Sequence, residues 1–211
     1  MSKENLHQIR QMLAQTAARL MAEDGINDFA YAKKKACRQL GVSDNSVLPS
    51  NAEIEDEIRL YQQIYNADEQ PILLNKLRES ALVTMRIFQQ FNPHLTGTVL
   101  DGIAGKYAIT DIHLFADSAK EVEIFLLNQE IPFDISEKSY RISDRPSKEK
   151  KERLRKTVPV FTLETELGLV KLSVFDINDL RITTKKSSDG NQAERLNFEG
   201  VRQLIKNNPL R

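Results

Sequence analysis

The chain of 211 residues balances 30 Lys and Arg against 30 Asp and Glu, and 40% of its residues are hydrophobic. The even charge excludes a protein whose whole surface is a polycation for nucleic acid, and the apolar fraction excludes a largely disordered chain. The single cysteine, Cys37, excludes a disulfide framework and a thiolate metal cluster. We expect a soluble, cytoplasmic protein without a membrane partner, because the sequence shows neither a signal-peptide pattern nor an apolar run near the ~20 residues that cross a bilayer.

Residues 1–92 carry the pattern of a helical bundle. Apolar residues recur at spacings of three and four in successive segments, and the segments are separated by short connections. The predicted helices run through residues 6–20, from a cap at Asn27 or Asp28 to Gly41, from Ser50-Asn51 through Tyr65, and from Pro71 to the residues before Pro93. This part is therefore predicted to be an all-α domain.

The pattern changes near residue 92, where short β-favouring segments and turn residues begin to alternate. Strands are predicted at residues 98–100, 109–115, 133–135, 140–142, 157–163 and 169–175, and helices at residues 118–128 and 193–206. The segments 133–135 and 140–142 are expected to form one strand pair, and those at 157–163 and 169–175 another. The sequence thus predicts an α+β protein, with a helical bundle at 1–92 and a domain at 93–211 in which helices flank a small mixed sheet.

Two polar stretches interrupt the second domain. Residues 144–156 hold seven basic and three acidic side chains. One interpretation is a solvated loop, and the other is an arm at residues 145–156 that contacts the phosphates of RNA. Residues 185–192 have the composition of a plain connection.

One segment of the second domain combines a turn with a polar strand face. The turn is Gly97-Thr98, and thirteen residues after Thr98 a strand carries Asp111 and His113. Because side chains alternate along a strand, these two residues share one face. Two ligands on one strand face can hold a divalent ion, and the backbone N–H groups and hydroxyl of the turn can hold phosphate.

This arrangement resembles the nucleotidyltransferase superfamily of the DNA polymerase β type, which has a Gly-Ser or Gly-Gly turn followed by an Asp-X-Asp strand. The resemblance covers roughly residues 92–180 and implies a nucleotidyltransferase-like fold that binds a nucleoside triphosphate and Mg²⁺ or Mn²⁺. By that resemblance Gly97 and Thr98 match the phosphate-binding turn, Asp111 is the catalytic metal-binding acid, and His113 stands at the second acid.

The acid set of the resemblance is incomplete in this chain. His113 replaces the second acid, and the strand expected to bear the third acid has Lys171 and Ser173 on its polar face. Two-metal nucleotidyl transfer needs carboxylates that neutralise and bridge both ions. In this scheme Lys106 or Lys171 steadies phosphate charge. The incomplete set implies that the pocket binds nucleotide or nothing, without turnover.

The alternative hypothesis is a non-catalytic interaction or regulatory module. Here the helical bundle contacts a protein partner or forms a homodimer, and the basic stretch at 145–156 adds a weak contact with RNA. The missing second and third acids favour this alternative over an active transferase.

Overall fold

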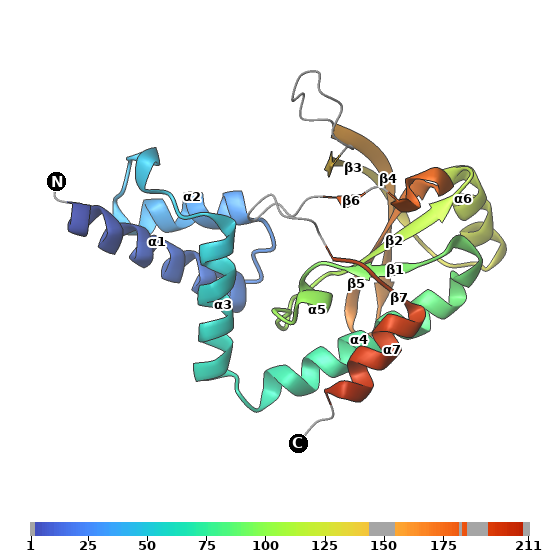
Figure 1. Cartoon of the computed structure of the whole chain (residues 1–211), viewed down its shortest axis with the longest axis horizontal. Coiled ribbons are helices and arrows are strands. Elements are labelled where there is room, and N and C mark those ends of the chain that lie inside the picture. Colours follow the sequence, from blue (N-terminus) through green and yellow to red (C-terminus); the bar gives the residue numbers. More distant parts are fainter. Residues whose placement is uncertain (1–2, 144–154, 182, 185–193, 209–211) are drawn as a thin grey trace. The chain divides into compact units, whose positions relative to one another are not determined.

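The computed structural model describes residues 3–143, 155–181, 183–184 and 194–208 (Figure 1). These residues divide into two compact units. The first unit contains residues 3–73 and 103–108, and the second contains the remaining described residues. The change of sequence pattern near residue 92 does not coincide with the limits of the units, because residues 74–92 group with the strands.

The first unit is helical. It contains α1 (Lys3–Glu23), α2 (Phe29–Leu40), the 3₁₀ turn η1 (Asn45–Val47), α3 (Asn51–Tyr65) and the start of α4 (Glu69–Ile87). These helices confirm the four predicted from the apolar spacing. Their small apolar residues form the core, with Leu13, Ala17, Ala36 and Ile54 at 1% exposure or less. Tyr65, which the spacing assigns to the inner stripe of α3, is instead 68% exposed.

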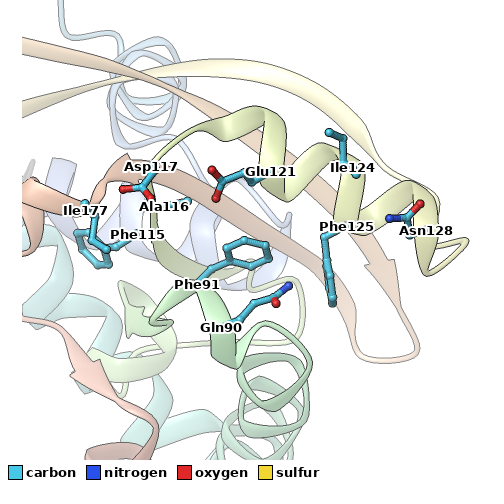
Figure 2. A pocket seen from close by; sticks show the side chains of 10 residues that line it. All are labelled: Gln90, Phe91, Phe115, Ala116, Asp117, Glu121, Ile124, Phe125, Asn128 and Ile177. Atoms are coloured by element: carbon cyan, nitrogen blue, oxygen red, sulfur yellow. The ribbon is translucent and has the colours of Figure 1, made fainter.

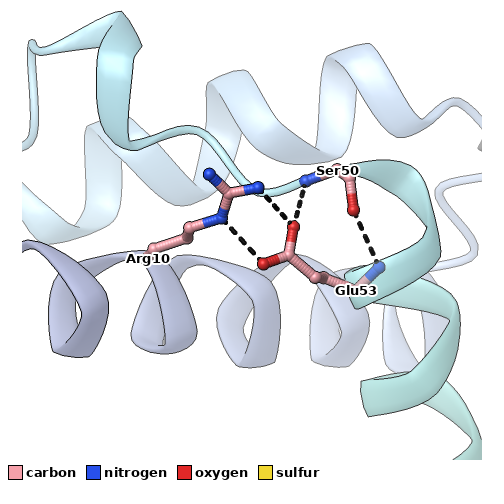
Figure 3. Close-up of polar contacts among 3 residues, drawn as sticks. All are labelled: Arg10, Ser50 and Glu53. Atoms are coloured by element: carbon pink, nitrogen blue, oxygen red, sulfur yellow. Dashed lines mark hydrogen bonds and ion pairs between the residues drawn. The ribbon is translucent and has the colours of Figure 1, made fainter. Parts of the chain in front are cut away.

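The helix ends in this unit follow local sequence chemistry. Asp28 caps α2 by accepting a hydrogen bond from the backbone N–H of Tyr31, and Gly41 ends the helix at a positive φ. Ser50 and Glu53 form a reciprocal capping box at the start of α3. Glu53 also accepts two hydrogen bonds of 2.7 Å from Arg10 on α1 (Figure 3), and this pairing lowers the pKa of Glu53 to about 2. The pair ties α1 to the first turn of α3.

The second unit is built on a mixed sheet. After α4 and the 3₁₀ turn η2 (Gln89–Phe91), its elements are β1 (His94–Thr96), α5 (Thr98–Asp101), β2 (Thr110–Ala116), α6 (Ala119–Asn128), β3 (Asp134–Ser143), β4 (Arg155–Thr165), β5 (Gly168–Asp176), η3 (Ile177–Arg181), β6 (Thr183–Thr184), β7 (Leu196–Asn197) and α7 (Phe198–Asn207).

The strand order of this sheet is β6-β3-β4-β5-β2-β1-β7. The described strand pairs are antiparallel except β2 and β5, which are parallel neighbours. On these two strands the residues of one face are buried aliphatics, namely Ile112, Leu114, Leu172 and Val174. The expectation of a mixed sheet with helices is confirmed, and so is the β4–β5 hairpin predicted at residues 157–175.

Three element predictions in this unit were wrong. Residues 98–100 belong to the short helix α5 rather than to a strand, between Gly97 and Gly102, which both have positive φ. Residues 134–135 and 140–142 of the two segments lie on one continuous strand, β3, which pairs with β4 rather than folding on itself. The helix predicted at residues 193–206 begins only at Phe198, as α7. Asn197 caps it by accepting a hydrogen bond from the N–H of Gly200.

The two polar stretches fall largely outside the described residues. Of residues 144–156, only 155 and 156 are described, and both belong to β4. The predicted connection at 185–192 lies wholly outside the described residues. The hypothesis of an RNA-contacting arm at 145–156 therefore stays a prediction.

Candidate functional site

The register of the two parallel strands assembles the candidate site. Asp111 on β2 lies opposite Lys171 on β5, and His113 lies opposite Ser173. Because in-register residues of neighbouring strands point to the same side of a sheet, these four side chains share one face. We call this surface, together with Lys138 and Tyr140 of β3, the Asp111 face.

The Gly97 turn lies against the Asp111 carboxylate. β1 pairs with β2 so that Thr96 is opposite Asp111, and the chain then turns at Gly97 with φ of +75°. A Cβ placed on Gly97 would come within 3.1 Å of Oδ2 of Asp111. The positive φ favours glycine at position 97, and a larger residue there would also press on the Asp111 carboxylate. The structure thus brings together Gly97 and Asp111, as the sequence motif predicts, with Thr98 as the next residue.

A lysine from β3 pairs with the same carboxylate. Nζ of Lys138 lies 3.5 Å from Oδ1 of Asp111, and 5.0 Å from the centre of the Tyr140 ring. Burial by itself lowers the pKa of Lys138, but the negative charge of Asp111 and the contact with Tyr140 outweigh it and raise the pKa. Lys138 is therefore a fixed positive charge beside Asp111.

Tyr140 covers the inner part of the Asp111 face. Its hydroxyl is hydrogen-bonded to Oγ of Ser173 at 2.8 Å, and its ring meets the His113 ring edge to face at 5.2 Å. Phe175 packs against both rings, at 4.6 Å from His113 and 5.1 Å from Tyr140. His113 is consequently enclosed in an aromatic cluster.

His113 is only 1% exposed, and neither of its ring nitrogens has a hydrogen-bond partner among the described residues. Burial lowers the pKa of His113 to about 3, with further lowering by the charges of Arg195 and Lys138. At neutral pH the imidazole is therefore uncharged. The residue at the second acid position of the resemblance supplies no negative charge.

The donors on this face do not fit a Mg²⁺ or Mn²⁺ pair. Asp111 is already paired with Lys138, His113 is neutral and enclosed, and Lys171 stands opposite Asp111. Hard divalent ions prefer several oxygen ligands, and a nearby ammonium opposes them. Within the described parts of the chain, no three His, Cys, Asp or Glu side chains gather in a way that could hold a metal ion.

Lys106, the other lysine proposed to meet phosphate, belongs to a different part of the structure. It lies in residues 103–108, which group with the first unit, whereas Asp111 belongs to the second. Its ammonium is 5.5 Å from the centre of the Tyr107 ring. The role of Lys106 at the phosphates therefore stays a prediction.

Two contributors to this face were missed from the sequence. Lys138 and Tyr140 lie where the sequence predicts two short strands, whereas the structure has one continuous strand, β3. Their spacing of two residues puts them on one strand face, but it does not place that face beside Asp111.

Arg78 of α4 contacts the short helix that follows the Gly97 turn. The sequence analysis did not predict this role. It is 4% exposed, and it donates through Nε to the carbonyl of Val99 and through a terminal nitrogen to the carbonyl of Leu100, each at 3.2 Å. These carbonyls belong to α5, which directly follows Gly97. Arg78 follows Leu74 by four residues and precedes Ala81 by three, so it lies on the apolar stripe of the helix. That position could have indicated a buried arginine.

A separate groove of about 460 Å³ lies in the same unit, between η2, the end of β2 and α6 (Figure 2). Ile124 and Ile177 are about half exposed at this groove, at 50% and 47%, and the half-buried Phe125 lies 5.5 Å from the Phe91 ring. Asp117 and Glu121 add two carboxylates, and no Lys or Arg is among the described residues that line it. The groove is thus apolar with an acidic border.

Comparisons of the chain with protein-family models, with curated proteins and with solved structures found no match. Among the described helices, none combines the length and the apolar character that crossing a membrane requires.

Proposed function

We propose that the chain is a nucleotide-binding protein whose Asp111 face binds the phosphate groups of a nucleoside triphosphate without transferring the nucleotide. The observation that carries this proposal is the contact of the Gly97 turn with Asp111 beside two lysines, Lys138 and Lys171. Anionic phosphates are attracted by such ammonium groups. The absence of a second and a third carboxylate at the matching positions supports binding rather than turnover.

Replacing Lys171 by methionine is expected to weaken nucleotide binding about tenfold, because one positive charge facing the phosphates is lost while the stem is kept. The measurement is thermal unfolding with ATP, GTP, CTP or UTP, each with Mg²⁺ and with EDTA. A nucleotide at ~100 times its dissociation constant should stabilise the protein by about 2.7 kcal/mol.

The matched control is Lys120→Met, which removes the same charge from an exposed position on α6. It should bind nucleotide as the unchanged protein does. If no nucleotide shifts the unfolding temperature in any condition, or if both variants bind equally, the Asp111 face is not a nucleotide site.

The acidic groove supports a second function, in which the chain is an interaction module for a peptide. Its half-exposed isoleucines offer apolar contacts, and Asp117 and Glu121 give it negative charge without a compensating cation among the lining residues. Charge complementarity favours a segment of a partner protein that carries apolar side chains flanked by Lys or Arg.

A fluorescent peptide of about 12 residues, with Leu at helical spacing and Lys elsewhere, is expected to bind this groove. Ile124→Ser and Glu121→Lys should each weaken binding about tenfold, because one removes an apolar contact and the other reverses a charge. Leu127→Ser and Glu123→Lys change the same helix at positions outside the groove and serve as controls.

Fluorescence anisotropy distinguishes the outcomes. Equal binding of a Leu/Glu peptide, or equal binding by Glu121→Lys, would contradict a charge-complementary groove. Self-association that Ile124→Ser abolishes, measured by sedimentation, would instead make a second copy of the chain the occupant.

A further inference from the structure

Both oxygens of the Asp111 carboxylate already have close neighbours in the folded chain. Oδ1 faces the ammonium of Lys138 at 3.5 Å, and Oδ2 faces the backbone of Gly97, where even a Cβ would come to 3.1 Å. The Asp111 side chain is 23% exposed, so it is partly shielded from water. The carboxylate therefore lies between the ammonium of Lys138 and the Gly97 turn.

The charges on the face sum to a positive value. Asp111 contributes one negative charge, whereas Lys138 and Lys171 contribute two positive charges. His113 is enclosed by Tyr140 and Phe175 and adds no carboxylate. A site that recruits two divalent cations needs the opposite sign of charge. A site with excess ammonium groups attracts an anion directly.

We infer that the Asp111 face binds the phosphate chain of its nucleotide as a bare anion, and that the ammonium of Lys138 supplies the positive charge beside Asp111. This inference rests on the proposed nucleotide site and specifies how its charge is balanced. Lys138 and Lys171 contact the phosphate oxygens. Asp111 lies beside Lys138 and opposes the phosphates electrostatically.

The sign of one substitution separates this arrangement from a metal-dependent site. In a metal site, Asp111→Asn removes a ligand and weakens nucleotide binding. In a site without metal, the same change removes a negative charge near the phosphates, so binding should tighten about threefold. The two charge arrangements therefore predict opposite changes for a substitution that preserves side-chain size.

The experiment is calorimetric titration of ATP, GTP, CTP and UTP, each into the full chain in EDTA and in Mg²⁺. We expect a dissociation constant in EDTA equal to or lower than that in Mg²⁺, since free ATP carries more negative charge. Lys138→Met should weaken binding about tenfold, and Lys138→Arg, which keeps the charge, should weaken it less. Lys120→Met is the control, and raised salt should weaken binding throughout.

The possible results distinguish failure of the metal-free arrangement from failure of the nucleotide site itself. Binding that requires Mg²⁺, or that Asp111→Asn weakens, overturns the metal-free arrangement and leaves the nucleotide site standing. Binding of Mn²⁺ alone to the unchanged protein, measured by electron paramagnetic resonance and lost in Asp111→Asn, also overturns it. Absence of binding of all four nucleotides in both conditions overturns both, and circular dichroism of each variant verifies that the chain is folded.

Discussion

Replacing His113 by leucine is expected to make the protein more resistant to acid. Between about pH 8 and pH 5, the free energy of unfolding of the variant should fall by about 2 kcal/mol less than that of the unchanged protein. The pKa of His113 is about 3 in the folded protein, against 6.5 for a free imidazole. The unfolded chain therefore takes up a proton first as the pH falls. The stability associated with neutral His113 is complete above about pH 6.5 and is lost progressively between pH 6.5 and about 3.

Near pH 8 the same substitution should change the free energy of unfolding by less than about 1 kcal/mol. Leucine removes two ring nitrogens that have no partner among the described residues, which favours the variant. It also loses the ring contacts with Tyr140 and Phe175, which favours histidine. These effects oppose one another, so the difference between the proteins should grow mainly with acidity.

Urea denaturation at several pH values, followed by circular dichroism, measures this difference. His94, whose pKa is lowered mainly by burial, is present in both proteins and cancels in the comparison. In addition, the NMR signals of the His113 ring should not titrate between about pH 7 and 5. Equal loss of stability in both proteins, or a His113 signal that titrates near 6.5, would refute the expectation.

The loss of stability that His113 causes in acid helps to decide whether this residue belongs to the binding site. Below about pH 6.5 a buried neutral imidazole stabilises the fold less than an apolar side chain of similar size would. Residues of this kind are typical of binding sites, where function and stability conflict. If His113→Leu stabilises the protein in acid but weakens nucleotide binding, His113 belongs to the site rather than only to the core.

The sequence predicted the elements whose signal is local and strong. The helices of the first unit have apolar stripes, and Asp28, Gly41 and Ser50 mark their ends through short-range hydrogen bonds. The β4–β5 hairpin was predicted because its strands alternate and a turn joins them. In each case the interactions that define the element lie within a few residues of one another.

The elements that were missed depend on distant residues. Thr98, Val99 and Leu100 favour strands by intrinsic propensity, yet Arg78 satisfies two carbonyls of the helix they form. β3 has mostly exposed, polar side chains at residues 134–139, so it lacks the alternation that identifies a strand. Its pairing with β4 is what defines it.

The same distinction applies to the candidate site. Gly97, Asp111 and His113 were found because they lie on one short segment, and their shared face follows from the period of a strand. Lys138 could not be placed beside Asp111, since two further strands separate β3 from β2 in the sheet. The charge balance of the face, on which the metal-free inference depends, therefore emerged only from the structure.

Replacing Arg78 by alanine is expected to reduce the free energy of unfolding of the second unit by about 3–5 kcal/mol. The side chain is 4% exposed, and its guanidinium donates to the carbonyls of Val99 and Leu100. Alanine would leave these carbonyls without their donors and would open a cavity between α4 and α5. Burial lowers the pKa of Arg78, but the guanidinium remains charged at every pH at which the protein folds.

Two further variants separate the contributions of side-chain volume, charge and hydrogen bonds to this loss of stability. Arg78→Met keeps most of the side-chain volume and should lose about 1.5–3 kcal/mol, which is the contribution of hydrogen bonds to a charged group. Arg78→Lys keeps the charge but cannot reach both carbonyls in the geometry of the guanidinium fork, so it should not restore full stability. Lys76→Ala, at an exposed position of the same helix, should change stability by less than about 0.5 kcal/mol.

Urea denaturation at neutral pH measures these differences, and nucleotide titration of Arg78→Met links them to the site. Because α5 directly follows Gly97, loss of its support should loosen the turn and weaken nucleotide binding even where the protein stays folded. If Arg78→Ala is no less stable than Lys76→Ala, the two carbonyls do not depend on the guanidinium. If Arg78→Met is destabilised yet binds nucleotide unchanged, the Gly97 turn holds its conformation without the Arg78 guanidinium.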